Sequence, residues 1–470
     1  MSKLEATPAV AAAGSAARPA PLKLWRFFGY GAGDAANNLA FSMGTMFLLL
    51  YYTDVVGLSA AAVGTMFLVV RIWDAFADLA AGRLVDITST RWGKFRPFIL
   101  FGSLPLLLLG VAVFAVPEGL SQDGKLIYAY VSYAALGVAY SLVNIPYGSL
   151  ASAMTQVTEE RAKLGAFRAM GSAVTIVLLA FVVSPQLQDA ENLGRSLLIT
   201  TSAFVVLGMA LYLFTVKSTR EVVQRDVDRV SLKQSLGTLR HNRALVMLCG
   251  SALSFLMGLF MLSTVQAYYA RDVLGNANYY IVLTLLSVGA TFLMGPLLPG
   301  LTRRFGKKRL YITAGLVAVV GGIGIVLAPP SQPWMCFVAF GVLGLGTATA
   351  NTLMWALEAD TVEYGEWANG VRTEGTTYAV FSFTRKLGQA LGGSAAAYGI
   401  GIAGYVAGAG AQSAGTIDGI RWITGLGPAL FVGIGVLIMI RYPLTDDVFR
   451  KMVQEVAERR EARRATEQNS

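Results

Sequence analysis

Long apolar segments recur along almost the whole chain, and they constrain its fold more than any other feature. About twelve segments of roughly 18 or more mostly apolar residues are long enough to cross a ~30 Å hydrocarbon core as helices. They span 27–52, 60–82, 97–117, 124–148, 164–184, 195–217, 244–270, 278–299, 309–328, 333–357, 374–404 and 423–442. Only 14% of the 470 residues are charged, so little of the chain remains for a soluble domain. We therefore predict an all-α membrane protein with twelve transmembrane helices.

The formal net charge of +10 reflects membrane topology and is no reason to expect nucleic-acid binding. Most of the 38 lysines and arginines lie in the N-terminus, the even-numbered connections and the C-terminus. The odd-numbered connections hold only Lys125, Arg195, Arg271 and Arg421. Because basic residues accumulate in cytoplasmic loops, we expect both termini in the cytoplasm. We expect the protein in a plasma membrane or a bacterial inner membrane.

A long basic connection divides the twelve spans into six and six, and each half has a Gly-plus-basic connection after its second span. These two connections, 82–97 and 300–309, indicate an internal duplication of the kind found in transporters with a central site. The predicted parts are a disordered cytoplasmic tail (1–24), an N-terminal six-helix bundle (25–217), a cytoplasmic loop (218–243), a C-terminal six-helix bundle (244–442) and a cytoplasmic tail (443–470).

The C-terminal tail carries apolar residues at a helical interval. Val448, Met452 and Val456 recur every four residues among arginines and glutamates. This pattern fits an amphipathic helix at the membrane interface, and it also fits a solvated charged tail.

Three charged residues interrupt the second apolar span. Arg71, Asp74 and Asp78 fall on one face of a helix, because Asp74 and Asp78 follow the arginine by three and seven residues. Each charge at mid-bilayer costs roughly 2.5–3.5 kcal/mol on insertion scales, so this face must meet a polar cavity or partner charges. Two carboxylates beside one arginine leave an unmatched negative charge, which favours a site for Na⁺ or protons. The alternative is an ion-pair lock between helices.

Polar residues in the first and fourth spans suggest a second site. Asp34 and Asn38 are one turn apart among small residues, and a carboxylate beside a carboxamide suits sugar hydroxyls. Tyr140 and Asn144 share a helical face just before Pro146, which is expected to break the helix ladder beside a cavity. The alternatives are that Asn38 joins two helices by hydrogen bonds, and that Pro146 makes a simple kink.

Three cations lie within later spans. Arg168 is in the fifth span, and Arg385 and Lys386 are in the eleventh. Lys386 is expected either to donate to sugar hydroxyls or to act as counter-ion to the acids across the cavity. Arg385 and Lys386 point about 100° apart on a helix, so one of them is expected to be structural.

An acidic cluster ends the tenth span, on the side where the basic connections lie. We expect Asp360 and Glu363 to pair with basic residues at a cytoplasmic gate, together with Asp86, Arg91 and Arg96 from the first half.

No soluble-enzyme motif occurs in a supporting context. The glycine pattern at 399–404 lies within an apolar helix with no preceding strand, so helix packing explains it better than dinucleotide binding. We therefore expect no enzyme, no ATP-driven pump and no cofactor besides a coupling ion, Na⁺ or H⁺.

Segments 51–59, 71–78, 91–97, 144–149 and 359–366 together resemble the glycoside-pentoside-hexuronide:cation symporters, the melibiose-permease-like branch of the major facilitator superfamily. The resemblance implies two six-helix bundles in the major facilitator fold, with alternating access and cation-coupled sugar uptake. It implies a cation site at Asp74, Asp78 and Ser141. It also places Tyr140, Arg168 and Lys386 in or beside the sugar pocket.

Two departures change the expected substrate. Asn38 and Asn144 stand where the melibiose permease has aspartates, and Asp34 stands where it has a neutral residue. Melibiose itself is therefore not expected, whereas a pentoside, glucoside or uronide fits asparagine side chains.

We predict a secondary transporter that imports a small glycoside or related sugar by symport with Na⁺ or H⁺ and functions as a monomer. The predicted sugar contacts are Asp34, Asn38, Tyr140, Asn144, Arg168 and Lys386. One alternative is a lysolipid or other amphiphile transporter of the same branch, which needs a lateral opening and an apolar cleft. Another is a non-transporting sensor, although no signalling domain is recognisable.

Overall fold

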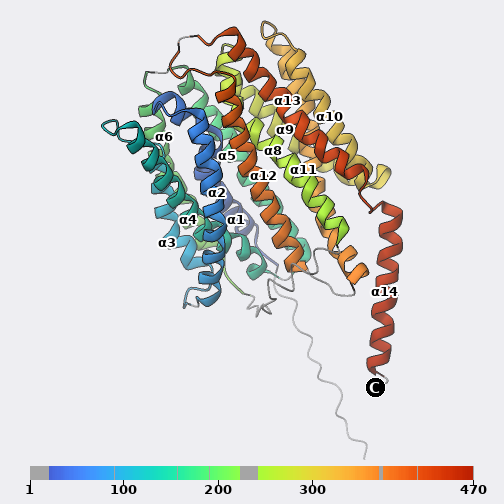
Figure 1. The fold of residues 1–470 in the computed structure, drawn as a ribbon. Helices are drawn as coiled ribbons and strands as arrows, with labels where there is room; N and C mark the ends of the chain where they lie inside the picture. Colours follow the sequence, from blue (N-terminus) through green and yellow to red (C-terminus); the bar gives the residue numbers. More distant parts are fainter. Residues whose placement is uncertain are drawn as a thin grey trace, which may run out of the picture.

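Twelve long helices stand side by side in the described part of the chain, and a thirteenth extends from one end of them (Figure 1). The computed structural model describes residues 21–88, 90–155, 157–189, 191–222, 242–369, 374–409 and 411–468. Most of the predicted N-terminal tail (1–24) and of the predicted central loop (218–243) lies outside these residues.

The first half of the chain forms six helices, blue to green in Figure 1. They are α1 (Leu24–Leu50), α2 (Ala60–Ile87), α3 (Arg96–Ala112), α4 (Gln122–Met154), α5 (Thr158–Val183) and α6 (Leu193–Ser218). The second half forms α8 (Arg243–Tyr268), α9 (Tyr279–Phe305), α10 (Lys307–Leu327), α11 (Pro333–Asn369), α12 (Glu374–Ile402) and α13 (Ala414–Ile440). Each predicted span overlaps one of these helices, which confirms the predicted all-α, twelve-helix architecture. Nine of the described helices are long and apolar enough to cross a membrane.

Two helices extend well beyond their predicted ends. α4 continues through Pro146 to Met154, and a break in its hydrogen-bond ladder beside a cavity stays a prediction. Pro146 is buried, and neighbouring helices hold the segment although one backbone hydrogen bond is missing. α11 continues past the predicted boundary at residue 357 to Asn369, because a helix that leaves the apolar layer keeps its own backbone hydrogen bonds.

The C-terminal tail forms α14 (Asp446–Gln468), which packs against α11. Met452 and Val456 are buried, and the indole Nε1 of Trp367 donates to Glu455 Oε2 at 2.7 Å. A solvated tail is therefore wrong for these turns, which lie against the bundle. Val448 is exposed, and contact of this helix with a membrane interface stays a prediction.

The two halves meet at the end opposite the chain termini. There Thr53 Oγ1 lies 2.8 Å from Tyr268 OH, Thr65 Oγ1 lies 2.7 Å from Tyr398 OH, and Ser184 donates to the carbonyl of Ala277 at 2.6 Å. One buried apolar core is continuous across both halves at this end. At the terminus end, a separate core lies within the second half alone. The bundle is thus joined at one end and divided at the other.

The two halves end their first helices in the same way, which supports the predicted duplication. A π-helical turn, η1 (Tyr51–Val55), follows α1, and a second, η3 (Tyr269–Val273), follows α8. Each turn leads into a glycine with positive φ, Gly57 at +79° and Gly275 at +69°. Glycine suits these positions because L side chains rarely adopt that backbone conformation.

Glu221 fixes the start of α3, and its removal is expected to destabilise the first half. Its carboxylate accepts the backbone N–H groups of Lys94, Phe95 and Arg96 at 2.7, 2.9 and 3.0 Å. Because hydrogen bonds to charged groups contribute about 1.5–3 kcal/mol each, Glu221→Ala should lower the thermal unfolding midpoint in detergent, and Glu221→Gln should lower it less. Glu118→Ala, at an exposed site, is the matched control. Equal midpoints for Glu221→Ala and Glu118→Ala would contradict this role.

Candidate functional site

A partly buried ion pair joins α1 to α5 in the first half. Arg168 Nε donates to Asp34 Oδ1 at 2.8 Å, and the guanidinium lies over the Tyr147 ring at 5.3 Å. Asn38 Nδ2 donates to Asp34 Oδ2 at 3.0 Å and to the Asp34 carbonyl at 2.9 Å. Three predicted sugar contacts therefore belong to one hydrogen-bonded network, in which the charge of Asp34 is balanced. Arg168 keeps 38% of its side chain exposed, so the network remains accessible.

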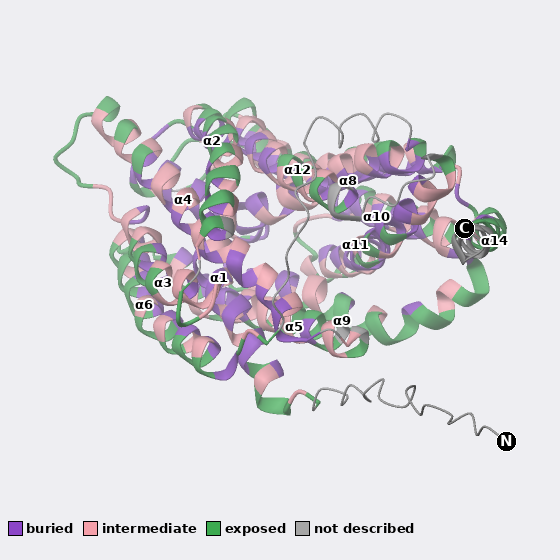
Figure 2. Ribbon diagram, turned by 90° about the horizontal axis from the view of Figure 1, so that it is seen from below, coloured by how far each residue is buried: buried purple, intermediate pink, exposed green. Residues whose placement is uncertain are grey.

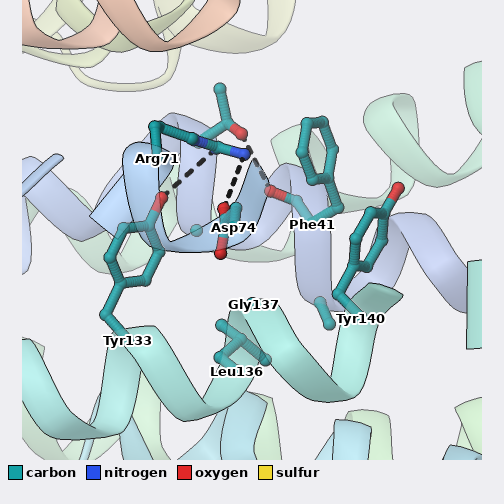
Figure 3. Close-up of a pocket in the computed structure, with 10 residues that line it drawn as sticks. Phe41, Arg71, Asp74, Tyr133, Leu136, Gly137 and Tyr140 are labelled. Atoms are coloured by element: carbon teal, nitrogen blue, oxygen red, sulfur yellow. Dashed lines mark hydrogen bonds and ion pairs between the residues drawn. The ribbon is translucent and has the colours of Figure 1, made fainter. Parts of the chain in front are cut away.

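A second pair lies within α2 and faces α4. Arg71 Nη1 is 3.3 Å from Asp74 Oδ2, and Arg71 Nη2 donates to Tyr133 OH at 3.3 Å (Figure 3). The other carboxylate oxygen of Asp74, Oδ1, is buried and has no hydrogen-bond partner. A buried acceptor without a donor costs free energy, so Asp74 retains the capacity to take a cation or a proton.

Gly137 leaves room for the Asp74 carboxylate between α2 and α4. The spacing of polar residues in the sequence did not point to this glycine. Gly137 lies on α4 directly against Asp74 Oδ1, where a Cβ would overlap the carboxylate. The same region forms a pocket between α1, α2 and α4 (Figure 3). The pocket is lined by Ala40, Phe41, Gly44, Thr45, Arg71, Asp74, Tyr133, Leu136, Gly137 and Tyr140.

Asp78 is paired across the two halves of the molecule. Ser141 Oγ donates to Asp78 Oδ1 at 2.7 Å, and Lys386 Nζ on α12 forms an ion pair with Asp78 Oδ2. Asp74 and Asp78 are therefore matched by two cations, Arg71 and Lys386. The predicted unmatched negative charge is wrong in this conformation, because the second cation lies 308 residues away in the chain. Of the two roles expected for Lys386, the structure shows the counter-ion.

The remaining predicted polar contacts occupy different surroundings. The Tyr140 ring stacks on Phe41 with 5.3 Å between centroids and lines the pocket beside Asp74. Asn144 Oδ1 is buried with no hydrogen-bond partner. Arg385 points away from Lys386 and lies over the Trp355 ring at 4.6 Å, so the two neighbouring cations do diverge as predicted.

Predicted gate residues are held within their own halves. Lys307 Nζ binds both oxygens of Asp360, at 2.6 and 2.7 Å, and Arg96 Nη2 donates to the carbonyl of Val216 at 2.7 Å. Arg91 lies over the ring of Trp92, Glu363 follows Asp360 by one turn of α11, and the side chain of Asp86 lies outside the described residues. These contacts pair Asp360 with α10, and a gate formed by these residues together stays a prediction.

A polar cluster at the joined end of the bundle was missing from the sequence-based predictions. Arg271 Nη1 pairs with Asp54 Oδ2 at 2.7 Å and Arg271 Nε with Asp272 Oδ1 at 2.9 Å, while Tyr405 OH donates to Asp54 at 2.9 Å. Asp54 and Asp272 occupy equivalent positions in the two π-helical turns. Comparison of these turns between the halves was the signal that could have revealed the cluster.

Comparison with known proteins identifies the family of this chain. A family described as "MFS/sugar transport protein" matches residues 29–446. The chain belongs to this family. It is 46% identical over 440 residues to a glucuronide carrier protein homolog of Escherichia coli K12, covering 93% of this chain and 96% of that protein. It is 34% identical over 441 residues to a putative 2,3-dihydroxypropane-1-sulfonate exporter of Salmonella typhimurium LT2, covering 92% and 95%.

A solved structure with little sequence similarity has the same fold. A bacterial homologue of the human lysosomal transporter Spinster, in an inward-facing and unoccupied conformation, matches with a TM-score of 0.67 at 15% identity. The match covers 93% of this chain and 99% of that chain. This member of the MFS/sugar transport family is therefore a multi-pass membrane transporter with the major facilitator fold. As predicted, it is a transporter and not an enzyme.

Substitution of Gly137 tests whether close packing against Asp74 matters. Gly137→Ala places a methyl group against the Asp74 carboxylate, so we expect displaced α2 and α4 and loss of transport. Gly165→Ala on α5 is the matched control, because nothing lies within 4 Å of its Cβ. Since alanine favours helices over glycine by roughly 0.5–1 kcal/mol, the control should unfold at the same or a higher temperature. The idea is wrong if both variants transport and unfold like the wild type.

Proposed function

We propose that this transporter imports a small glycoside or related sugar by symport with Na⁺ or H⁺. The observation that carries the proposal is the ion pair between Lys386 of the second half and Asp78 of the first, beside Ser141 and near Asp74. An ion pair that joins two mobile halves at a pair of acids links the charge of the site to the arrangement of the halves.

Competition for Asp78 supplies the coupling. A cation at Asp74, Asp78 and Ser141 would meet hard oxygen ligands and would replace Lys386 as the counter-ion of Asp78. The freed lysine, 42% exposed even when paired, could then bind substrate. Cation and sugar would thus both bind more tightly to the conformation in which Lys386 is released from Asp78. Such a difference in affinity between conformations is what coupling requires. Among the described residues no group of three or more His, Cys, Asp or Glu suits a metal ion, so Ser141 or the substrate would complete the coordination of Na⁺.

The division of the bundle supports an inward-facing state. With both termini in the cytoplasm, as the basic connections favour, the joined end faces outward and the divided end faces the cytoplasm. The Asp54–Arg271 pair would then close the outer end, and Lys386–Asp78 would be the innermost described polar contact between the halves. Both halves belong to one chain, so a monomer contains the whole pathway.

The sugar contacts proposed in the first half are Asp34, Asn38, Tyr140, Asn144 and Arg168. The Asp34–Asn38–Arg168 network offers carboxylate, amide and guanidinium groups on one side of the bundle interior, and the Tyr140 ring is nearby in the same half. Such a polar surface suits hydroxyl groups better than the acyl chain of a lysolipid, which is the alternative cargo. A thermal-shift panel of sugars against lysolipids, with and without Na⁺, separates the two.

Removal of either acidic charge tests the cation site. Asp74→Asn and Asp78→Asn should abolish gradient-driven sugar uptake into vesicles, because amides bind Na⁺ more weakly and do not take up protons at neutral pH. Uptake is measured with separately imposed Na⁺ and pH gradients, and expression is checked in the same membranes. Unchanged cation-dependent accumulation in both variants would refute the assignment.

Removal of Lys386 should tighten cation binding while it impairs uptake. Lys386→Gln leaves Asp78 without its counter-ion, so a cation meets less competition. For a partly exposed ion pair worth about 1 kcal/mol, the cation affinity should rise about fivefold. The measurement is a Na⁺ or pH titration of thermal stability in purified protein. Weaker cation binding in this variant would show that Lys386 supports the cation instead of competing with it.

A further inference from the structure

Arg385 is a cation without a counter-ion. Its guanidinium carbon lies 4.6 Å from the Trp355 ring centroid and 5.8 Å from that of Phe381, while Nη1 is buried with no hydrogen-bond partner. Within the described part of the chain, Arg385 forms no ion pair. Aromatic rings offer about 0.5–2 kcal/mol to a nearby cation, less than a charge at this depth costs.

Three other cations in the described part of the interior are paired with acids. Arg71 has Asp74, Arg168 has Asp34, and Lys386 has Asp78. Of these four cations, Arg385 alone has no acidic partner among the described residues. A group that the fold leaves unbalanced at such a cost is a candidate to bind an anion that comes and goes.

The surroundings of Arg385 face the first half. α10 and α13 pack against each other and against α11 and α8, so they cover the outer side of the second half. α12 packs against α2 of the first half, and α11 and α12 border the region between the halves in Figure 2. Arg385 of α12 meets Trp355 of α11 on this side, next to Lys386, which reaches Asp78.

Two groups on α11, the helix that Arg385 contacts through Trp355, suit a polar ring. Asn351 lies one turn before Trp355 on α11, and its buried Oδ1 has no hydrogen-bond partner. Trp355 is 42% exposed, with Tyr378 stacked at 6.2 Å. A sugar can rest its C–H face on an indole ring and donate a hydroxyl to an amide oxygen. A carboxylate on that sugar can accept hydrogen bonds from the guanidinium.

We propose that Arg385, Asn351 and Trp355 form a subsite in the second half that binds the carboxylate-bearing end of an acidic sugar. The proposal rests on the proposed function of sugar transport and narrows its substrate to uronate-type sugars. Arg385 binds the carboxylate, Asn351 accepts a hydroxyl hydrogen bond, and Trp355 supports the ring. The two relatives above are named for a glucuronide and a sulfonate, both anionic, which agrees with this chemistry.

The test compares an acidic and a neutral sugar of the same shape. Purified protein is reconstituted into liposomes, and the half-maximal concentrations for exchange of methyl β-D-glucuronide and methyl β-D-glucoside are measured. In Arg385→Gln, the value for the glucuronide should rise about 10- to 100-fold, as for loss of a charge-assisted hydrogen bond, while that for the glucoside changes by less than about threefold. Arg385→Lys keeps the charge and should lose less.

A control variant and three outcomes make the test decisive. Arg441→Gln removes an exposed arginine at the end of α13 and should exchange both sugars like the wild type. If Arg385→Gln lowers exchange of both sugars equally, or of neither, the subsite is refuted while sugar transport stands. If the wild type exchanges neither sugar, the proposed function itself fails. Should Arg385→Gln not fold, Arg385→Lys must show a smaller loss that still affects the glucuronide more than the glucoside, and Asn351→Ala must weaken exchange of both sugars.

Discussion

The pairing of charges inside an apolar bundle is the constraint on which this structure depends. Each unpaired ion at mid-bilayer costs several kcal/mol, and desolvation makes a broken buried pair more costly than the pair itself is worth. The fold meets this constraint by placing acid and base on different helices, as with Asp34 of α1 and Arg168 of α5. The charged residues thereby fix how α1 and α5 sit against each other, and Lys386 does the same for α2 and α12.

One of these pairs differs from the others because it crosses the two halves. Asp34–Arg168 and Asp74–Arg71 can persist in any arrangement of the halves, since both partners belong to the first half. Asp78–Lys386 persists only while α2 and α12 stay close. Movement of the halves must therefore either stretch this pair or replace Lys386 with another cation. In the proposed mechanism a coupling ion is the replacement, so electroneutrality would link ion binding to the movement.

The sequence alone predicted the helices and most polar positions, but not the partners of those positions. Segment length and apolar content are local properties, so the twelve helices and the polar face of α2 followed from spacing. The counter-ion of Asp78 followed only as one of two roles expected for Lys386, because periodicity gives a face of one helix but not its rotation against another 308 residues away. Gly137 was missed for the same reason: the role of a glycine depends on the side chain that faces it, here Asp74.

Several buried polar groups of the interior lack hydrogen-bond partners, and they bear on which substrate the protein carries. Asp74 Oδ1 and Asn144 Oδ1 in the first half and Asn351 Oδ1 in the second are buried acceptors without donors, and Arg385 Nη1 is a buried donor without an acceptor. A sugar supplies hydroxyl donors, a coupling cation supplies positive charge, and a carboxylate supplies the missing acceptor. A neutral sugar would satisfy the amides but leave Arg385 unbalanced, and a lysolipid chain would satisfy none of these groups. The proposed acidic sugar, together with a cation, would satisfy these four groups.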